Sequence, residues 1–545
     1  MSQTYESKIL DHLGLVAGMY DELEIGEQID NRIAQDTEQR KVSVGEAVKA
    51  MVLNGLGFIE QRLYLATQFF ETLPTERLLG SGVRPEHLND DVLGRTLDSL
   101  YEYGVTELFR DLAAHSAERL GLTPRFAHLD ATSFHVDGEY NSGEDEPEEG
   151  VIHVGQGYSR DRRPGLNQIV LDLIVEHQAS LPILMEPLSG NASDQASFPE
   201  LIDRHVSHLQ NAHGFDYVVA DSALYSADHV KELNGNSVQF ITRVPETIGE
   251  AQQVIRETNP TNLKQLAEGY RARELFSEYG DVEQRWLVVQ SDEASGRAQK
   301  HIRKKVAREH QAEAKAFSEL TWREFACRED AEKALEDFET DLKASILSEK
   351  RVSRGIRYAL DNQAPESQEF EESDECWFAG GTLTPSDAYE AQLLKRRSLF
   401  ILATNELDEN RLSAKEILQG YKGQVRVERG FRFLKDPLFL ASAFYLQSER
   451  RVMALLMVMT LCLLVYSALE WRIREGLRVQ ELAFPDQKGN PTQKPTARWV
   501  FQSFRGIHLL LVDQKRLVLN LQEHHRSIVT VLGHRYETLY ASYPT

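Results

Sequence analysis

The chain has 545 residues, which is too many for one small core and predicts about three to four domains. Hydrophobic residues make up 41% and charged residues 27%, as expected for a soluble globular protein. The cysteines, Cys327, Cys376 and Cys462, form no CxxC pair. This pattern supports neither a disulfide framework nor a cysteine zinc site, and it predicts a reducing, cytoplasmic setting.

The net charge of −24 bears on nucleic-acid binding, which usually shows as a basic footprint. Net charge is a sum, however, and binding needs only a local basic stripe. The acidity therefore lowers the expectation of DNA binding without excluding it.

Two segments bear on membranes. The start, MSQTYESKILDHLG, lacks the basic start and apolar run of a signal peptide. Residues 452–469 carry no charge over 18 positions, which just reaches the length of a membrane span. Because this is the only such segment and charges crowd both of its ends, we expect a buried core helix. A membrane-associated protein is the alternative.

The first part of the chain, up to residue 122, has helical apolar spacing and predicts a small bundle. Helices are expected over 43–59, 92–104 and 106–121, with Gly121 as a stop.

An alternation of strand-like and helical runs follows and predicts an α/β layer pattern. The expected strands are 125–136, 151–159, 167–177, 181–190, 215–222 and 238–245, and the expected helices are 194–210 and 223–235.

Residues 246–395 have a different sequence pattern and are interpreted as an inserted domain. They combine a long charged helical run, 301–350, with strand candidates at 284–291 and 355–360. The buried-strand pattern resumes at 398–405, and a helix is expected over 412–435. The tail contains a linker and a hairpin pattern at 506–521.

Two aspartates stand at strand-like runs where apolar neighbours indicate burial. Asp130 lies in HLDATS and Asp221 ends VVADS. A buried carboxylate is costly unless it is paired or bound to a metal. Acids at the ends of buried strands suit a Mg²⁺ site, although a strand-end turn or helix cap is the simpler interpretation of either residue alone.

Glu428 lies in a basic helical segment, YKGQVRVERGFRFLK. Each helical residue turns by ~100°, so Tyr421, Gln424, Glu428 and Lys435 share one face. A single Glu on a basic face suits a metal ligand flanked by phosphate contacts. An ordinary intrahelical ion pair is the alternative.

These residues resemble the Y-x₂-R-x₃-E-x₆-K pattern of IS4-group bacterial insertion-sequence transposases, with Gln424 in place of the Arg. Further motifs resemble the IS1634 subgroup: HLDATSFHVDG, HVGQGYSRDRRPGLNQ, GNASD, VVADSALYS, FITRVP, LATNE and ERGFRFLKDP.

This resemblance implies an α/β fold with an RNase H-like catalytic core, a mixed five-stranded sheet with flanking helices. It places Asp130 on the first strand, Asp221 at the fourth and Glu428 on a later helix. The implied division is an N-terminal all-helical domain (1–122), core halves (123–245 and 396–480) around an insertion (246–395), and a C-terminal region (481–545).

The implied activity is that of a DDE transposase, which cleaves insertion-sequence ends and joins them to target DNA. Asp130, Asp221 and Glu428 would hold two Mg²⁺ ions about 3.5–4 Å apart, and Mn²⁺ could substitute. Phosphate contacts would come from five residues: Tyr421, Gln424, Lys435, Arg429 and Arg432. The expected partners are terminal inverted repeats, target DNA and a second copy in a synapsed homodimer, at the nucleoid of a prokaryotic cell.

Weaker signals have simpler explanations. Asn191 and Asp194 favour a turn and a helix cap. The arginines of YSRDRRPG (Arg160, Arg162, Arg163) suit either a phosphate grip or an exposed hairpin tip. The basic cluster Arg303, Lys304, Lys305 and Arg308 is typical of a solvated face. Core packing is expected for Trp286, Trp322 and Trp377, and a plain strand position for His135 and His153.

Two other classes remain open. A stand-alone metal nuclease needs the same acids. A DNA-binding remnant without catalysis is disfavoured by the presence of all three acids.

Overall fold

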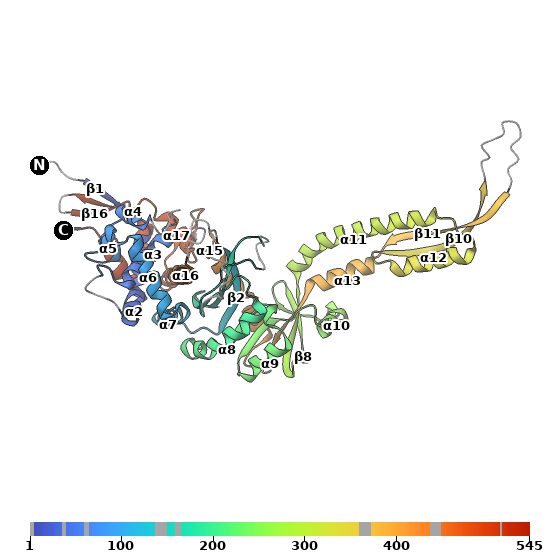
Figure 1. The fold of residues 1–545 in the computed structure, drawn as a ribbon, viewed down its shortest axis with the longest axis horizontal. Coiled ribbons are helices and arrows are strands. Elements are labelled where there is room, and N and C mark those ends of the chain that lie inside the picture. Colours follow the sequence, from blue (N-terminus) through green and yellow to red (C-terminus); the bar gives the residue numbers. More distant parts are fainter. Residues whose placement is uncertain are drawn as a thin grey trace, which may run out of the picture.

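The computed structural model describes residues 5–34, 40–58, 65–136, 150–157, 165–358, 372–436, 448–512 and 515–544. Figure 1 shows an elongated molecule. A helical bundle carrying both termini forms one end, a mixed sheet lies in the middle, and a long arm projects from the other side.

The central sheet is mixed and has nine strands. In spatial order they are β4 (Pro182–Leu188), β3 (Gln168–Glu176), β2 (Phe126–His135), β5 (Tyr217–Ala220), β6 (Gln239–Arg243), β12 (Leu399–Thr404), β9 (Val282–Ser291), β8 (Tyr270–Tyr279) and β7 (Lys264–Ala267). Strand β2 runs antiparallel to β3 and parallel to β5, and β5 runs parallel to β6.

The sheet is larger than the expected five strands. The first five in chain order are contiguous, but β12 pairs antiparallel with β6 and continues into the β9–β8–β7 meander. Strand β6 would otherwise present an open edge of unpaired backbone groups, which proteins avoid. Part of the segment 246–395 therefore belongs to the same sheet.

Both faces of the sheet are covered, which explains why every residue of β3 is buried. One face packs against α8 (Asp194–His213) and α9 (Ala227–Gly235). The other packs against α14 (Ala414–Lys422), α15 (Val425–Leu434) and α16 (Glu449–Val479).

The bundle surrounds α16. Its other helices are α1 (Leu13–Glu22), α2 (Ile25–Arg32), α3 (Val44–Leu56), α4 (Ala66–Glu71), α5 (Thr75–Leu79), α6 (Asp90–Tyr103), α7 (Val105–Arg119), α17 (Ala497–Ser503), α18 (Glu523–Leu532) and α19 (His534–Leu539). Among the described residues, α16 is the one helix long and apolar enough to cross a membrane, yet 89% of its most apolar window is buried. This packing agrees with the core-helix interpretation of 452–469.

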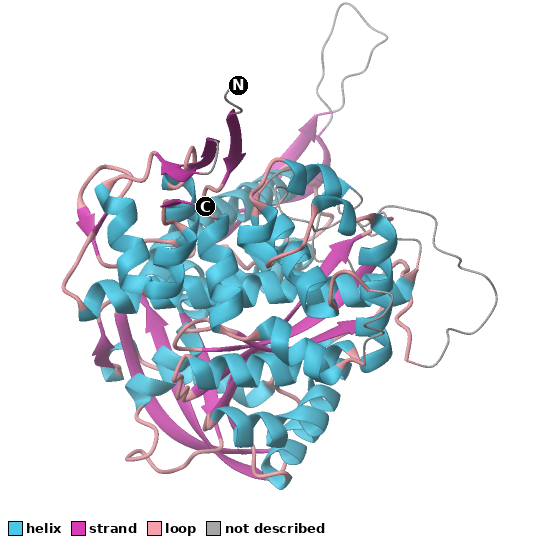
Figure 2. Cartoon of the chain, turned by 90° about the vertical axis from the view of Figure 1, so that its left-hand side faces the viewer, coloured by secondary structure: helices cyan, strands magenta, loops and turns pink. Residues whose placement is uncertain are grey.

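One sequence expectation is wrong in this part of the chain. The N-terminal segment is not all-helical, because β1 (Tyr5–Ile9) pairs with β15 (His508–Val512). That sheet also holds β16 (Lys515–Leu519) and β17 (Tyr543–Pro544), and β15 with β16 forms the expected hairpin. Figure 2 shows this small sheet beside both chain ends. A short strand whose partner lies some 500 residues away leaves no local pattern.

The expected strand at 151–159 is absent from its described part, 151–157, where only Gly155 forms a bridge, to Gln168. The neighbouring strands explain why. Strand β4 occupies the edge of β3 from Val170 to Val175, so this segment meets β3 only at its first residue, Gln168.

The expected single helix over 412–435 is divided at Gly423 and Gln424. The Gln424 amide donates to the Tyr421 carbonyl and the Arg426 amide to the Gly423 carbonyl, which are i→i+3 bonds. This short tightened turn separates α14 from α15 and weakens the argument that one regular helical face carries the whole motif.

The arm is built from five elements: α11 (Asp292–Thr321), α12 (Arg328–Asp341), β10 (Ser345–Tyr358), β11 (Glu372–Pro385) and α13 (Asp387–Ser398). The expected helical run over 301–350 is thus interrupted at 322–327 and ends at residue 341. Helix α10 (Gly249–Glu257) precedes the meander, and β13 (Phe484–Pro485) pairs with β14 (Pro491–Thr492) in the tail.

Candidate functional site

Three charged side chains stand in one row across the parallel strands. Strands β2 and β5 pair His128 with Val219, and β5 and β6 pair Val219 with Ile241. Two residues further along each strand are Asp130, Asp221 and Arg243. Since neighbouring strands lie about 4.8 Å apart, the two aspartates are adjacent and Arg243 follows them.

All three positions face the same side of the sheet. Side chains alternate along a strand, and Val219 and Ile241 belong to the core that also contains Ile417 and Leu418 of α14. Asp130, Asp221 and Arg243 are therefore on the face that α14 and α15 cover.

Backbone contacts hold both aspartates. The Ala131 amide donates to Asp130 Oδ1 at 2.8 Å, and the Ala223 amide donates to Asp221 Oδ1 at 2.9 Å. The Thr242 hydroxyl donates to the Asp221 carbonyl at 2.6 Å. Asp221 therefore also caps a short helical turn, so the simple capping interpretation and a functional role coexist.

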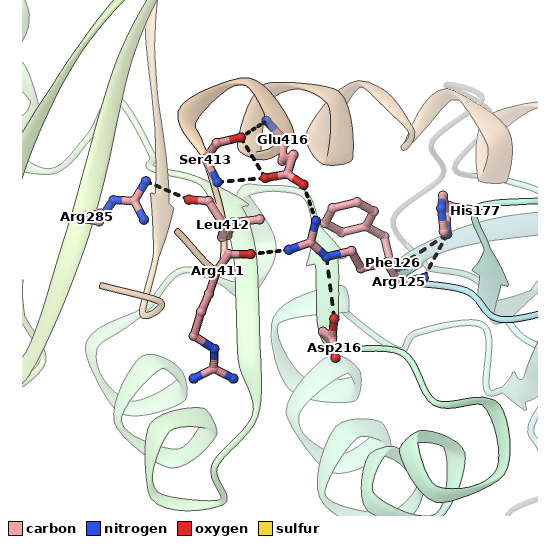
Figure 3. A network of polar contacts seen from close by, with 9 residues as sticks. All are labelled: Arg125, Phe126, His177, Asp216, Arg285, Arg411, Leu412, Ser413 and Glu416. Atoms are coloured by element: carbon pink, nitrogen blue, oxygen red, sulfur yellow. Dashed lines mark hydrogen bonds and ion pairs between the residues drawn. The ribbon is translucent and has the colours of Figure 1, made fainter. Parts of the chain in front are cut away.

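A polar network fixes the start of α14 over the sheet (Figure 3). Arg125, just before β2, donates to the Glu416 carboxylate and to the Arg411 carbonyl, and it pairs with Asp216 at 3.5 Å. Glu416 and Ser413 form a capping box at the start of α14. Hydrogen bonds from Ser413 are the main cause that lowers the pKa of Glu416, and Arg125 adds to it.

The junction of α14 and α15 is held even more closely. Gln424 Nε2 donates to the Leu129 carbonyl at 2.6 Å, one residue before Asp130. A Cβ at Gly423 would lie 2.5 Å from His128 Cε1, so only glycine permits this approach. The catalytic candidates on the sheet and on α15 are thus connected through direct contacts.

Glu428 is exposed on α15, on the side of Tyr421. Burial raises the pKa of the Tyr421 phenol, the positive charge of Arg243 opposes this rise, and the negative charges of Asp221 and Glu428 add to it. Arg243, Asp221 and Glu428 therefore all act on the Tyr421 hydroxyl. The structure brings these side chains to one region despite the break between the helices.

The basic candidates on α15 differ in placement. Arg429 and Arg432 are exposed, and Lys435 Nζ lies 5.9 Å from the centre of the Phe134 ring on β2. Arg426 is half-buried, and the negative charge of Glu176 acts on it. Arg426 therefore faces the sheet, as the helical spacing indicates, and it is not on the Glu428 face.

A cleft of about 750 Å³ opens beside Asp221. Its walls include Ser193 and Ala196 at the start of α8, and Pro245 after β6. The GNASD motif therefore reaches the same cleft as Asp221, and Ser193 is the residue before α8.

The acidic side chains of the site suit a metal ion that takes few protein ligands. Among the residues described, no three His, Cys, Asp or Glu side chains are grouped closely enough to hold an ion by themselves. Mg²⁺ commonly takes only one or two carboxylates and completes its shell with waters and substrate phosphates. The adjacent carboxylates of Asp130 and Asp221 meet this requirement.

Sequence reasoning did not single out Arg243, although the FITRVP motif contains it. The sequence feature that could have identified it is an arginine at the end of an otherwise apolar strand. Its guanidinium lies 5.6 Å from the Phe400 ring centre and 3.2 Å from Glu246.

The tryptophans and the other weak signals can be placed as well. Trp286 is fully buried and Trp377 packs on the core of the arm, as expected, but Trp322 is 80% exposed because it follows the last turn of α11. His135 lies in β2, as expected, and His153 lies in the segment that forms no strand. Arg160, Arg162 and Arg163 lie outside the described residues.

Two parts of the chain match models of known protein families. Residues 122–465 match the family described as "Transposase DDE domain", and residues 5–114 match a domain of unknown function. No curated protein matches the chain by sequence. Among solved structures, the chain is similar to the piggyBac transposase in a synaptic complex with hairpin DNA, at a TM-score of 0.37 and 9% identity, over 93% of this chain and 83% of that one.

The family match identifies a DDE-type, DNA-cleaving enzyme, a class that generally uses divalent metal ions. Because the match covers well over half of its length, the chain belongs to the DDE transposase family. It is a DNA transposase.

Proposed function

We propose that Asp130, Asp221 and Glu428 are the metal-binding acids of this transposase and that Mg²⁺ is the metal. The observation that carries the proposal is the alignment of Asp130, midway along β2, with Asp221, directly after the parallel strand β5, beneath the helix that holds Glu428. Two carboxylates with waters and phosphate oxygens suit Mg²⁺, and Mn²⁺ would substitute.

We further propose that this site belongs to an RNase H-like core of an IS4-group enzyme, closest to the IS1634 subgroup, acting by cut-and-paste transposition. Support comes from the first five strands, which occur in the order β4-β3-β2-β5-β6. In chain order the first of these strands, β2, carries Asp130 and the fourth, β5, leads into Asp221, as the resemblance implies.

The domain division is also a proposal. Residues 1–122 would contribute to DNA-end binding or dimerisation, and 246–395 would be the insertion between the core halves. Terminal inverted repeats and target DNA are the proposed partners of a synapsed homodimer at the nucleoid.

In the mechanism, the bound metal ions would activate the attacking oxygen and stabilise the leaving oxygen of an in-line displacement. The three acids hold them. Tyr421 stays protonated because burial raises its pKa, so its hydroxyl can donate to a phosphate oxygen. Lys435, Arg429 and Arg432 supply positive charge along α15.

Gln424 has a different role in this proposal. Its amide donates to Leu129, so it positions α15 against β2. Arg243, which acts on Tyr421 and lies in register with Asp221, supplies a guanidinium that the motif lacks at Gln424. We therefore assign to Arg243 the phosphate contact that the resemblance implies for Gln424.

The test uses the full chain and a duplex carrying the DNA that flanks its gene. Asp130→Asn, Asp221→Asn and Glu428→Gln should each reduce Mg²⁺-dependent cleavage to background while duplex binding persists. The matched control is Asp337→Asn, an exposed acid of α12 on the projecting arm, which should cleave normally. Full cleavage by any one of the three variants would overturn the assignment.

A further inference from the structure

A stripe of basic side chains follows the outer face of α11. Arg297, Lys300, Lys304, Arg308 and Lys315 are spaced three, four, four and seven residues apart. At ~100° per residue they fall within about 80° of the helix circumference. At 1.5 Å per residue the stripe is about 27 Å long.

The stripe points away from the protein. All five side chains are exposed, while Ile302, Val306 and Phe317 on the other face are buried against the arm. The structure thus uses one face of α11 for packing and leaves the other to solvent.

Ion pairing distinguishes four of the five stripe residues from the other cations of α11, since Arg297 pairs with Glu293 at 3.5 Å. Arg303 pairs with Glu390 at 3.2 Å, and Lys305 pairs with Glu309 at 3.8 Å. Within the part of the chain that the structure covers, Lys300, Lys304, Arg308 and Lys315 make no ion pair. Their charges are therefore not neutralised by neighbouring described acids.

Charge is segregated within the arm. Helix α12 is strongly acidic, and its exposed acids are Glu329, Asp330, Glu332, Glu336, Asp337, Glu339 and Asp341. In Figure 1, α11 and α12 lie on opposite sides of the β10–β11 hairpin. A chain with a net charge of −24 thus presents a localised basic surface on its projecting arm.

We propose that this stripe binds the phosphate backbone of duplex DNA, as a contact separate from the catalytic site. The proposal rests on DNA being the substrate of this transposase. Duplex DNA carries one negative charge per about 1.7 Å of axis, so a straight row of cations meets a matching row of phosphates. Lysine ammonium groups meet phosphate as point charges, which positions DNA without reading its sequence.

The stripe explains how an acidic protein engages DNA. The net charge of −24 disfavours the approach of a duplex, and the arm offers an attractive site at a distance from the sheet. DNA held on the arm would approach the catalytic acids in a restricted orientation.

The test measures binding of the full-length protein to a labelled 40-base-pair duplex of mixed sequence in EDTA, which prevents cleavage. Fluorescence anisotropy over a series of KCl concentrations gives the slope of log Kobs against log [KCl]. Each phosphate contact adds about 0.9 to its magnitude. The variant K300Q/K304Q/R308Q/K315Q should lower the magnitude by up to about 3.6, for four contacts.

The matched control is R328Q/K333Q on acidic α12, which should leave the slope unchanged. A slope change in the stripe variant smaller than one contact, about 0.9, would overturn the proposal. So would a salt-sensitive loss of self-association with unchanged DNA binding, because the partner would then be the acidic helix of a second copy. If the wild-type chain bound no duplex at all, DNA as the substrate would fail, which differs from failure of the stripe alone.

Discussion

Replacing Gly423 by alanine tests the contact that positions α15. The added Cβ would lie 2.5 Å from His128 Cε1, 2.6 Å from His128 Nε2 and 2.9 Å from the Gly420 carbonyl oxygen. An ordinary contact begins near 3.4 Å, so about 0.9 Å of movement is needed. His128 is fully buried and cannot yield, so the junction between α14 and α15 moves away from β2.

Two effects are expected from this movement. Overpacking a well-packed site costs about 1–3 kcal/mol of folding free energy. Because α15 carries Glu428, its shift of nearly 1 Å should also reduce Mg²⁺-dependent end cleavage by about a hundredfold. Urea denaturation gives the first quantity, and single-turnover cleavage of the flanking-DNA duplex gives the second.

Gly235→Ala is the matched control, since nothing lies within 4 Å of a Cβ at that position in α9. It should be neutral or slightly stabilising, by up to about 1 kcal/mol, with normal cleavage. Equal stability and equal cleavage of Gly423→Ala and Gly235→Ala would refute the reasoning.

Three further predictions follow from the same region. The pKa of buried His128 is lowered to about 3, so the folded state keeps it neutral while the unfolded chain takes up a proton below pH 6.5. The contribution of neutral His128 to the free energy of unfolding is complete above pH 6.5 and falls by roughly 2 kcal/mol on acidification to pH 5. His128→Gln should flatten this pH dependence in urea titrations, and an unchanged pH dependence would contradict the prediction. In Gln424→Glu the carboxylate cannot donate to the Leu129 carbonyl at neutral pH, so the variant should lose about 1–3 kcal/mol of folding free energy and cleave more slowly. Cleavage at the wild-type rate would show that this hydrogen bond does not position α15. Arg125→Met removes the donors to Glu416 and should lower the melting temperature. Lys231→Met, which removes an exposed ion pair with Asp281, is the control expected to shift it less.

Much of the fold is predictable from local sequence. Helices α3, α6, α7 and α8 and strands β3 and β12 lie where hydrophobic periodicity and turn residues indicate. The buried placement of 452–469 follows from its charged flanks. The two strands that lead to Asp130 and Asp221 are also marked by apolar runs, and the family match extends over both.

Other features depend on partners that local patterns do not reveal. β1 needs β15, and β6 gains β12 and the meander beyond it, because strand pairing joins segments far apart in the chain. The helix break at Gly423 arises from the close approach to His128, which exists only once α15 packs on β2.

The candidate site likewise combines features that the sequence predicts with features that only the fold defines. The sequence by itself determined the acids, the motif order and the basic character of the Glu428 segment, since these depend on residue type and spacing. Only the tertiary structure decided that Asp130, Asp221 and Arg243 stand in one row and that the Gln424 amide donates to the Leu129 carbonyl. It also decided that α11 exposes its unpaired cations and that Trp322 faces solvent. Register across strands and exposure on an arm are relations between distant segments, so they become defined only when the chain is folded.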